Sequence, residues 1–135
     1  MYIQVNILAI LVCAVVYAVI GAIWYSPLVF GKPWSRLSRA RVEPSFSREQ
    51  LVLYLGSFFV GLVSAAILAV IISVAGVVTI WEAVILGVAA WAGFTAAPSF
   101  ATTIFEGKPF GLWGINVGYP FISTIVMAVI FISWR

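Results

Sequence analysis

Four long apolar segments, separated by polar connections, make up most of the sequence. They cover about residues 3–25, 51–74, 82–104 and 112–134, and each has the length of about 20 residues that a helix needs to cross a membrane. Within a hydrocarbon layer, a helix satisfies every backbone hydrogen bond inside its own segment. The pattern predicts an all-α fold with one transmembrane domain over residues 1–135, built as a bundle of four transmembrane helices.

Two connections end in patterns typical of a helix start. Residues 79–82 (Thr-Ile-Trp-Glu) fit a capping box, and residues 47–50 (Ser-Arg-Glu-Gln) fit the same pattern. A carboxylate at this position is stabilised by the helix dipole. We therefore interpret Glu82 as a capping residue rather than a catalytic acid.

The first connection, residues 26–48, carries its own amphipathic pattern. Trp34 and Leu37 lie one helical turn apart, while Arg36, Arg39 and Arg41 fall mostly on other sides. This spacing predicts a short amphipathic helix at the membrane interface, ended by a proline at position 44. Its basic side either favours anionic lipid or serves only to set the orientation of the chain.

Composition agrees with a membrane protein, since 64% of residues are hydrophobic and only 8% are charged, against about 25% charged in an average soluble domain. The first and third connections hold six of the seven basic residues: Lys32, Arg36, Arg39, Arg41, Arg48 and Lys108. Basic connections stay in the cytoplasm. We therefore expect these two connections in the cytoplasm and both termini outside, in the plasma (inner) membrane.

A short sequence recurs after the first and third segments. Residues 30–34 (Phe-Gly-Lys-Pro-Trp) and 106–110 (Glu-Gly-Lys-Pro-Phe) share Gly-Lys-Pro-aromatic at an offset of 76 residues. Glycine can cap a helix end, lysine can face its negative pole, and proline prevents the helix from continuing. The match is explained either by two parallel two-helix hairpin repeats or by convergence on an effective helix stop.

Small residues recur every four positions on three of the segments. They are Ala14, Ala18 and Ala22 in the first; Ser57, Gly61, Ala65, Ala69 and Ser73 in the second; and Ala89, Gly93, Ala97 and Ala101 in the third. Such stripes let helices approach closely in lipid, within one chain or between subunits. Pro98 and Pro120 fall inside the third and fourth segments and predict kinks, whose exposed carbonyls Thr95 and Asn116 can satisfy.

Reactive groups are scarce. The chain has no histidine, and Cys13 is its one cysteine, so an intramolecular disulfide, a Cys/His zinc site and haem ligation by histidine are excluded within this chain. Six aromatic residues near predicted helix ends are typical of interfacial belts rather than of a cofactor site: Trp24, Tyr25, Trp34, Trp81, Trp113 and Trp134. We expect no catalytic residues, no metal, no cofactor and no nucleic-acid partner.

Two stretches of the chain resemble a known family. Residues 21–28 (Gly-Ala-Ile-Trp-Tyr-Ser-Pro-Leu), followed by residues 30–34, look like the signature of the domain-of-unknown-function family 1761. Residues 105–108 (Phe-Glu-Gly-Lys), with Asn-Val-Gly-Tyr at 116–119, are similar to its second signature. The resemblance covers essentially the whole chain. It implies a small four-helix membrane protein and supplies no activity.

Both resembling regions fall on the predicted cytoplasmic side, where seven residues can converge: Trp24, Tyr25, Lys32, Glu106, Lys108, Asn116 and Tyr119. One interpretation is a polar pocket for a lipid headgroup or a small amphipathic ligand. The other is that these residues fasten the two hairpins together.

Three functions follow from these patterns. The first is a non-enzymatic membrane protein that forms a homo-oligomer or an accessory subunit of a larger complex, suggested by the small-residue stripes and the lack of reactive groups. The second is a passive channel or small-molecule transporter, with Pro98, Pro120, Asn116 and Tyr119 along the path. The third is binding of membrane lipid headgroups through the basic connection.

Overall fold

The computed structural model describes residues 5–38 and 48–134, and all regular structure within these residues is helical. The elements are α1 (Ile7–Trp24), α2 (Gly31–Ser38), α3 (Arg48–Ala75), α4 (Ile80–Trp91), the π-helix η1 (Ala92–Ala96), α5 (Ala97–Glu106) and α6 (Phe110–Ser133). Four spans in the described residues are long and apolar enough to cross a membrane, the third being α4, η1 and α5 together. The predicted all-α architecture with four transmembrane helices is confirmed.

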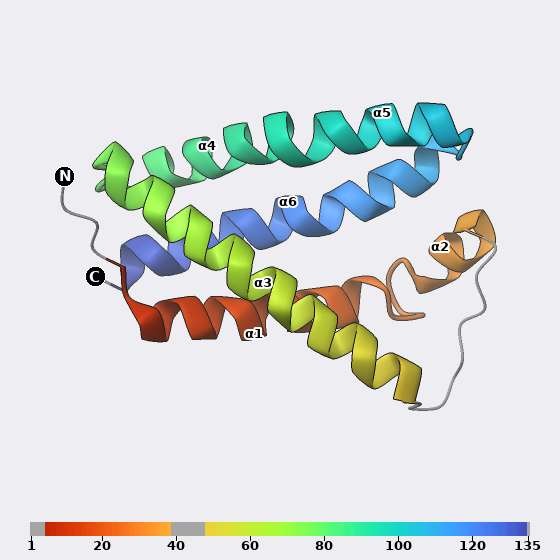
Figure 1. The fold of residues 1–135 in the computed structure, drawn as a ribbon, viewed down its shortest axis with the longest axis horizontal. Coiled ribbons are helices and arrows are strands. Elements are labelled where there is room, and N and C mark those ends of the chain that lie inside the picture. Colours follow the sequence, from red (N-terminus) through yellow and green to blue (C-terminus); the bar gives the residue numbers. More distant parts are fainter. Residues whose placement is uncertain (1–4, 39–47, 135) are drawn as a thin grey trace.

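The spans alternate in direction, so that α1 begins and α6 ends at the same end of the molecule (Figure 1). There, the Asn6 Nδ2 donates to the carbonyl oxygen of Trp134 over 3.5 Å. Helix α2 and the turn after α5 lie at the opposite end (Figure 1). Helix α1 packs mainly on α3, α4 packs on α6, and contacts between α1 and α6 join the two pairs. This pairing is the one that two consecutive hairpins produce.

The helix starts follow from their caps. The Thr79 hydroxyl accepts from the Glu82 backbone N–H over 3.2 Å, and the Glu82 carboxylate accepts from the Thr79 N–H over 3.3 Å, which confirms that capping box. Asn6 caps α1 by accepting from Ala9 N–H, so α1 begins at Ile7, and the predicted start near residue 3 was too early. The predicted cap at Ser47, the residues Arg39 and Arg41 and the proline at position 44 lie outside the described residues.

The two Gly-Lys-Pro copies adopt different structures, so the common role expected for their glycines was wrong. Gly107 has φ 66° and ends α5 in the left-handed conformation, as predicted. Gly31 instead begins α2, because its N–H donates to the Ser26 carbonyl oxygen and a Cβ there would lie 2.5 Å from the Tyr25 carbonyl oxygen. The amphipathic helix α2 is confirmed. Its apolar residues contact protein, with Trp34 against Tyr25 and Leu37 against Gly111.

The small-residue stripes differ in what they face. On α3, Gly61, Ala65 and Ala69 are buried, and a Cβ on Gly61 would meet Tyr17 of α1 at 2.8 Å. That stripe packs within the chain. The stripe on the third span is exposed throughout, at Ala89, Gly93, Ala97 and Ala101.

Three indole N–H groups donate to backbone carbonyl oxygens near the two prolines. Before Pro98, the helix widens into η1, and the Ala96 carbonyl oxygen accepts from Trp113 Nε1 over 3.2 Å; the Ser99 hydroxyl donates to the Thr95 carbonyl. On the turn before Pro120, the Ile115 and Val117 carbonyl oxygens accept from Trp24 Nε1 and Trp91 Nε1 over 2.8 and 2.9 Å. The repair expected of the Thr95 and Asn116 side chains stays a prediction. Trp24 and Trp113, which were expected near helix ends, also donate hydrogen bonds to the backbone of neighbouring helices.

Candidate functional site

A cleft of about 200 Å³ opens between α5 and the first half of α6. Its lining comes from two helices and the turn that joins them: Ser99, Thr102, Thr103, Glu106, Lys108, Leu112, Trp113 and Asn116. The turn between α5 and α6, from which Lys108 lines the cleft, lies at the end of the bundle that also carries α2 (Figure 1). Three of the seven residues predicted to form a site, Glu106, Lys108 and Asn116, line it.

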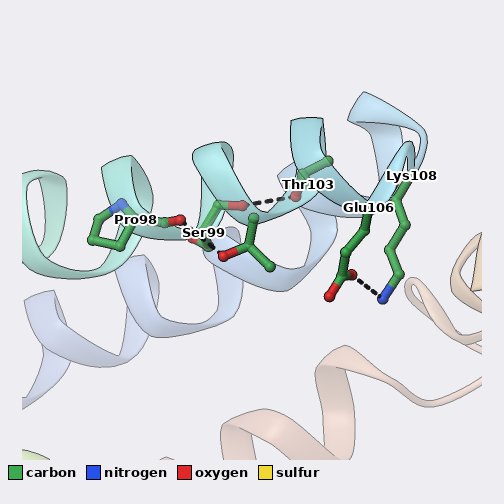
Figure 2. A network of polar contacts seen from close by, with 6 residues as sticks. Pro98, Ser99, Thr103, Glu106 and Lys108 are labelled. Atoms are coloured by element: carbon green, nitrogen blue, oxygen red, sulfur yellow. Dashed lines mark hydrogen bonds and ion pairs between the residues drawn. The ribbon is translucent and has the colours of Figure 1, made fainter.

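The α5 side of the cleft is a row of hydroxyl groups. The Thr102 hydroxyl donates to the Pro98 carbonyl oxygen over 3.2 Å, and the Thr103 hydroxyl donates to that of Ser99 over 2.8 Å. Figure 2 shows Ser99 and Thr103 along the helix that leads to Glu106. Hydrogen bonds to the preceding turn satisfy hydroxyl donors in an apolar setting. Each oxygen keeps the capacity to accept from a ligand.

An ion pair stands at the outer end of this row. Lys108 Nζ lies 2.8 Å from Glu106 Oε2, and the two side chains are 55% and 48% exposed. The turn at Gly107 separates the two residues, and Figure 2 shows their side chains extending side by side from it. A half-exposed pair of this kind contributes only about 0–1 kcal/mol. The pair can therefore open at little cost when another charged group arrives.

Asn116 on α6 is held by a residue from the other hairpin. The Tyr25 hydroxyl donates to Asn116 Oδ1 over 3.0 Å, and the Tyr25 ring packs edge-on against Trp34 and Tyr119. A tyrosine phenol is protonated at neutral pH, so the Tyr25 hydroxyl is the donor in this bond. Because Oδ1 accepts from Tyr25, the Nδ2 amide is the group that Asn116 offers as a donor.

Trp24 and Tyr119 lie outside the cleft lining and join α1 to α6. Tyr119 is 7% exposed, and its hydroxyl donates to the Tyr17 carbonyl oxygen over 2.7 Å. Its ring lies on Gly21, where a Cβ would come within 2.7 Å. Trp24 lies in the same way on Gly118 of α6.

Lys32 is the predicted residue that the structure does not bring to the others. It is exposed on α2, and within the described ranges no ion pair joins it to Glu106. The seven residues thus divide into cleft residues, fastening residues and one separate lysine. Five lining residues were not predicted: Ser99, Thr102, Thr103, Leu112 and Trp113. The spacing of Ser99, Thr102 and Glu106 by three and four residues places them on one helix face, and this signal could have found them.

The arrangement offers binding groups at one end of the bundle: an ammonium, a carboxylate, an amide and a row of hydroxyls. Among the described residues, no group of three or more His, Cys, Asp or Glu side chains could hold a metal ion. Cys13 is fully buried in α1.

The four apolar spans and the polar cleft at one end define a small helical membrane protein. The chain belongs to the family described as proteins of unknown function (DUF1761), whose model matches residues 8–132. No curated protein and no solved structure matches the chain.

Proposed function

We propose that this chain is a non-enzymatic membrane protein that assembles with a second copy of itself through the outer face of the third span. The observation that carries the proposal is the exposure of the stripe formed by Ala89, Gly93, Ala97 and Ala101. The equivalent stripe on α3 is buried against α1 within the chain. The stripe on the third span faces away from its own bundle, which leaves a second copy to cover it.

The energetics of helices in lipid support this assignment. Helix association in a membrane relies on close packing, because lipid already solvates apolar side chains, and small residues allow backbones to approach. A Cβ on Gly93 would have no atom of this chain within 4 Å, so a partner helix can reach the backbone there. The third span is also the least covered of the four, with 17% of its apolar window buried against 39% for α6.

A twofold arrangement suits such a surface, because each copy presents the same stripe to the other. Phe105 continues the four-residue spacing beyond Ala101 and is 90% exposed. A large exposed ring beside a row of small residues gives the face both a ridge and a groove, as close packing requires.

The substitution Gly93→Leu tests the proposal, with Gly114→Leu on α6 as the matched control, since neither position has a neighbour within 4 Å of its Cβ. We expect energy transfer between labelled copies in liposomes to show a dimer for the wild type and for Gly114→Leu. Gly93→Leu should weaken it about tenfold, equivalent to about 1.4 kcal/mol. A wild type that stays monomeric at every protein-to-lipid ratio contradicts the proposal, as does migration of the wild type only with other proteins in native gels.

The cleft favours a second candidate function, the binding of a lipid headgroup. Its polar lining, its half-exposed charges and its place at the end of the bundle suit a group at the membrane surface. Lipid that remains bound to the purified wild type and is lost from Lys108→Gln supports this function, and equal retention by both excludes it. Transport along Asn116 and Tyr119 has less support, because Tyr119 is buried against Tyr17 and does not line the cleft.

A further inference from the structure

We infer that the α5–α6 cleft selects a headgroup carrying both a phosphate and a primary ammonium, as in phosphoethanolamine. The inference rests on the headgroup-binding function proposed above and adds the chemical class of the ligand. It follows from which charges, donors and rings the cleft contains.

The mouth of the cleft presents two opposite charges, Lys108 Nζ and Glu106 Oε2, 2.8 Å apart. A ligand with two opposite charges can separate this pair and form two ion pairs in its place. Because the pair is half-exposed and worth little in itself, the exchange has a low cost. The neutral charge sum at the mouth therefore matches a zwitterion better than a simple anion.

The donors assign the two ends of the ligand. Lys108 Nζ and the Asn116 Nδ2 amide both donate and suit phosphate oxygens, to which charged donors form the stronger hydrogen bonds. Asn116 is exposed and lines the cleft, and within the described part of the chain the one hydrogen bond of its side chain is the one that Oδ1 accepts from Tyr25. The Glu106 carboxylate accepts only, and it suits an ammonium with N–H groups.

The aromatic residues of the cleft argue against a headgroup with a quaternary ammonium. Trimethylammonium groups have no N–H donor for a carboxylate and are usually held by cages of several aromatic rings. Trp113 is the single aromatic residue in the lining, and its Nε1 is occupied by the Ala96 carbonyl oxygen. A phosphatidylglycerol headgroup carries a negative phosphate and no ammonium, so it would place negative charge near the Glu106 carboxylate with no cation to pair with it.

The volume of the cleft limits which part of a lipid can enter it. At about 200 Å³, the cleft is smaller than the roughly 300–1,000 Å³ of pockets that enclose drug-sized ligands. It therefore holds a headgroup rather than acyl chains. Phe110, which is 62% exposed and stacks on Phe100, provides apolar surface beside the cleft for the start of those chains.

Native mass spectrometry of the full chain, taken from nanodiscs with equal phosphatidylethanolamine, phosphatidylcholine and phosphatidylglycerol, tests the inference. We expect the wild type to retain the ethanolamine lipid about tenfold over the other two, the ratio that about 1.4 kcal/mol gives. Glu106→Gln should lose this preference, and Lys108→Gln should lose bound phospholipid altogether. Lys32→Gln removes the same charge from an exposed lysine at the same end and should behave as the wild type.

The outcomes separate the two proposals. Phospholipid that depends on Lys108 without preference for ethanolamine overturns this inference and leaves headgroup binding standing. Equal retention by the wild type, Lys108→Gln and Lys32→Gln overturns both. Competition with soluble phosphoethanolamine tests whether the ligand is the lipid or the free compound. Displacement of the lipid, or binding of the soluble compound alone, supports the headgroup chemistry. An ethanolamine preference that is unchanged in Glu106→Gln contradicts it.

Discussion

The indole ring of Trp24 on α1 lies on the backbone of Gly118 on α6. A Cβ at position 118 would come within 2.7 Å of Trp24 Cζ2, and the indole Nε1 donates to the Ile115 carbonyl oxygen over 2.8 Å. The relation is reciprocal, since Tyr119 on α6 lies on Gly21 of α1, where a Cβ would also come within 2.7 Å of the ring. Two large rings on two glycines thus join the first hairpin to the second.

Gly118→Ala should destabilise the bundle by about 1–3 kcal/mol, because the added methyl group overpacks against the fixed indole. The matched control is Gly114→Ala, one turn earlier on the same helix, where a Cβ meets nothing within 4 Å. That substitution should be neutral or stabilise by up to about 1 kcal/mol through helix propensity. Unfolding titrations in mixed micelles measure both, and equal effects of the two substitutions would show that the contact is unimportant.

Trp91→Phe should cost about 0.5–1.5 kcal/mol in the same titration. The substitution keeps an aromatic ring against Phe121 and removes the Nε1 donor to the Val117 carbonyl oxygen, and interhelical hydrogen bonds in membranes are of this size. Trp81 lies on the same helix and is 72% exposed, so Trp81→Phe should change stability by less than about 0.5 kcal/mol. A Trp91→Phe protein as stable as Trp81→Phe would contradict the role assigned to the indole.

Thr79→Ala should destabilise the start of α4 by about 0.5–2 kcal/mol, because it removes the hydroxyl that accepts from the Glu82 N–H. Thr79→Ser retains an acceptor at the same place and should recover most of that loss. Hydrogen exchange at the first turn of α4 gives a local measurement. Equal protection in the alanine and serine variants would argue against the cap.

Periodicity and caps were enough to predict the four spans, the short helix α2 and the cap at Thr79, since these depend on residues close in sequence. The sequence could not predict which small-residue stripe packs inside its own bundle. The four-residue spacing on α3 and on the third span is the same whether the packing partner is α1 or another chain. What separates them is Tyr17, which lies on Gly61, and this contact joins residues distant in sequence.

The candidate site was predictable in part for the same reason. Glu106, Lys108 and Asn116 stand near one turn, so sequence placed them together. Trp24 and Tyr119 were grouped with them because both resembling regions fall on the predicted cytoplasmic side, yet their partners are the carbonyl oxygens of Ile115 and Tyr17. Backbone acceptors leave no trace in the sequence.

Sidedness provides a further prediction. The connection between α3 and α4 lies at the end where α1 begins, and the turn after α5 lies at the other (Figure 1). The basic residues favour a cytoplasmic location for the end that carries the turn after α5. With Cys13 replaced by alanine, Val78→Cys should react with an impermeant maleimide in intact cells, and Lys108→Cys should react only after permeabilisation. The reverse labelling pattern would invert the orientation.

Disulfide cross-linking through the third span tests the central proposal most directly. In a Cys13→Ala background, Gly93→Cys places one thiol in the exposed stripe, and Val15→Cys places one on the exposed face of α1 as a control. Mild oxidation in native membranes should convert most Gly93→Cys protein to a covalent dimer of this chain and leave Val15→Cys monomeric. Dimer yields that are equal at the two positions, or absent at Gly93→Cys, would contradict assembly through this face.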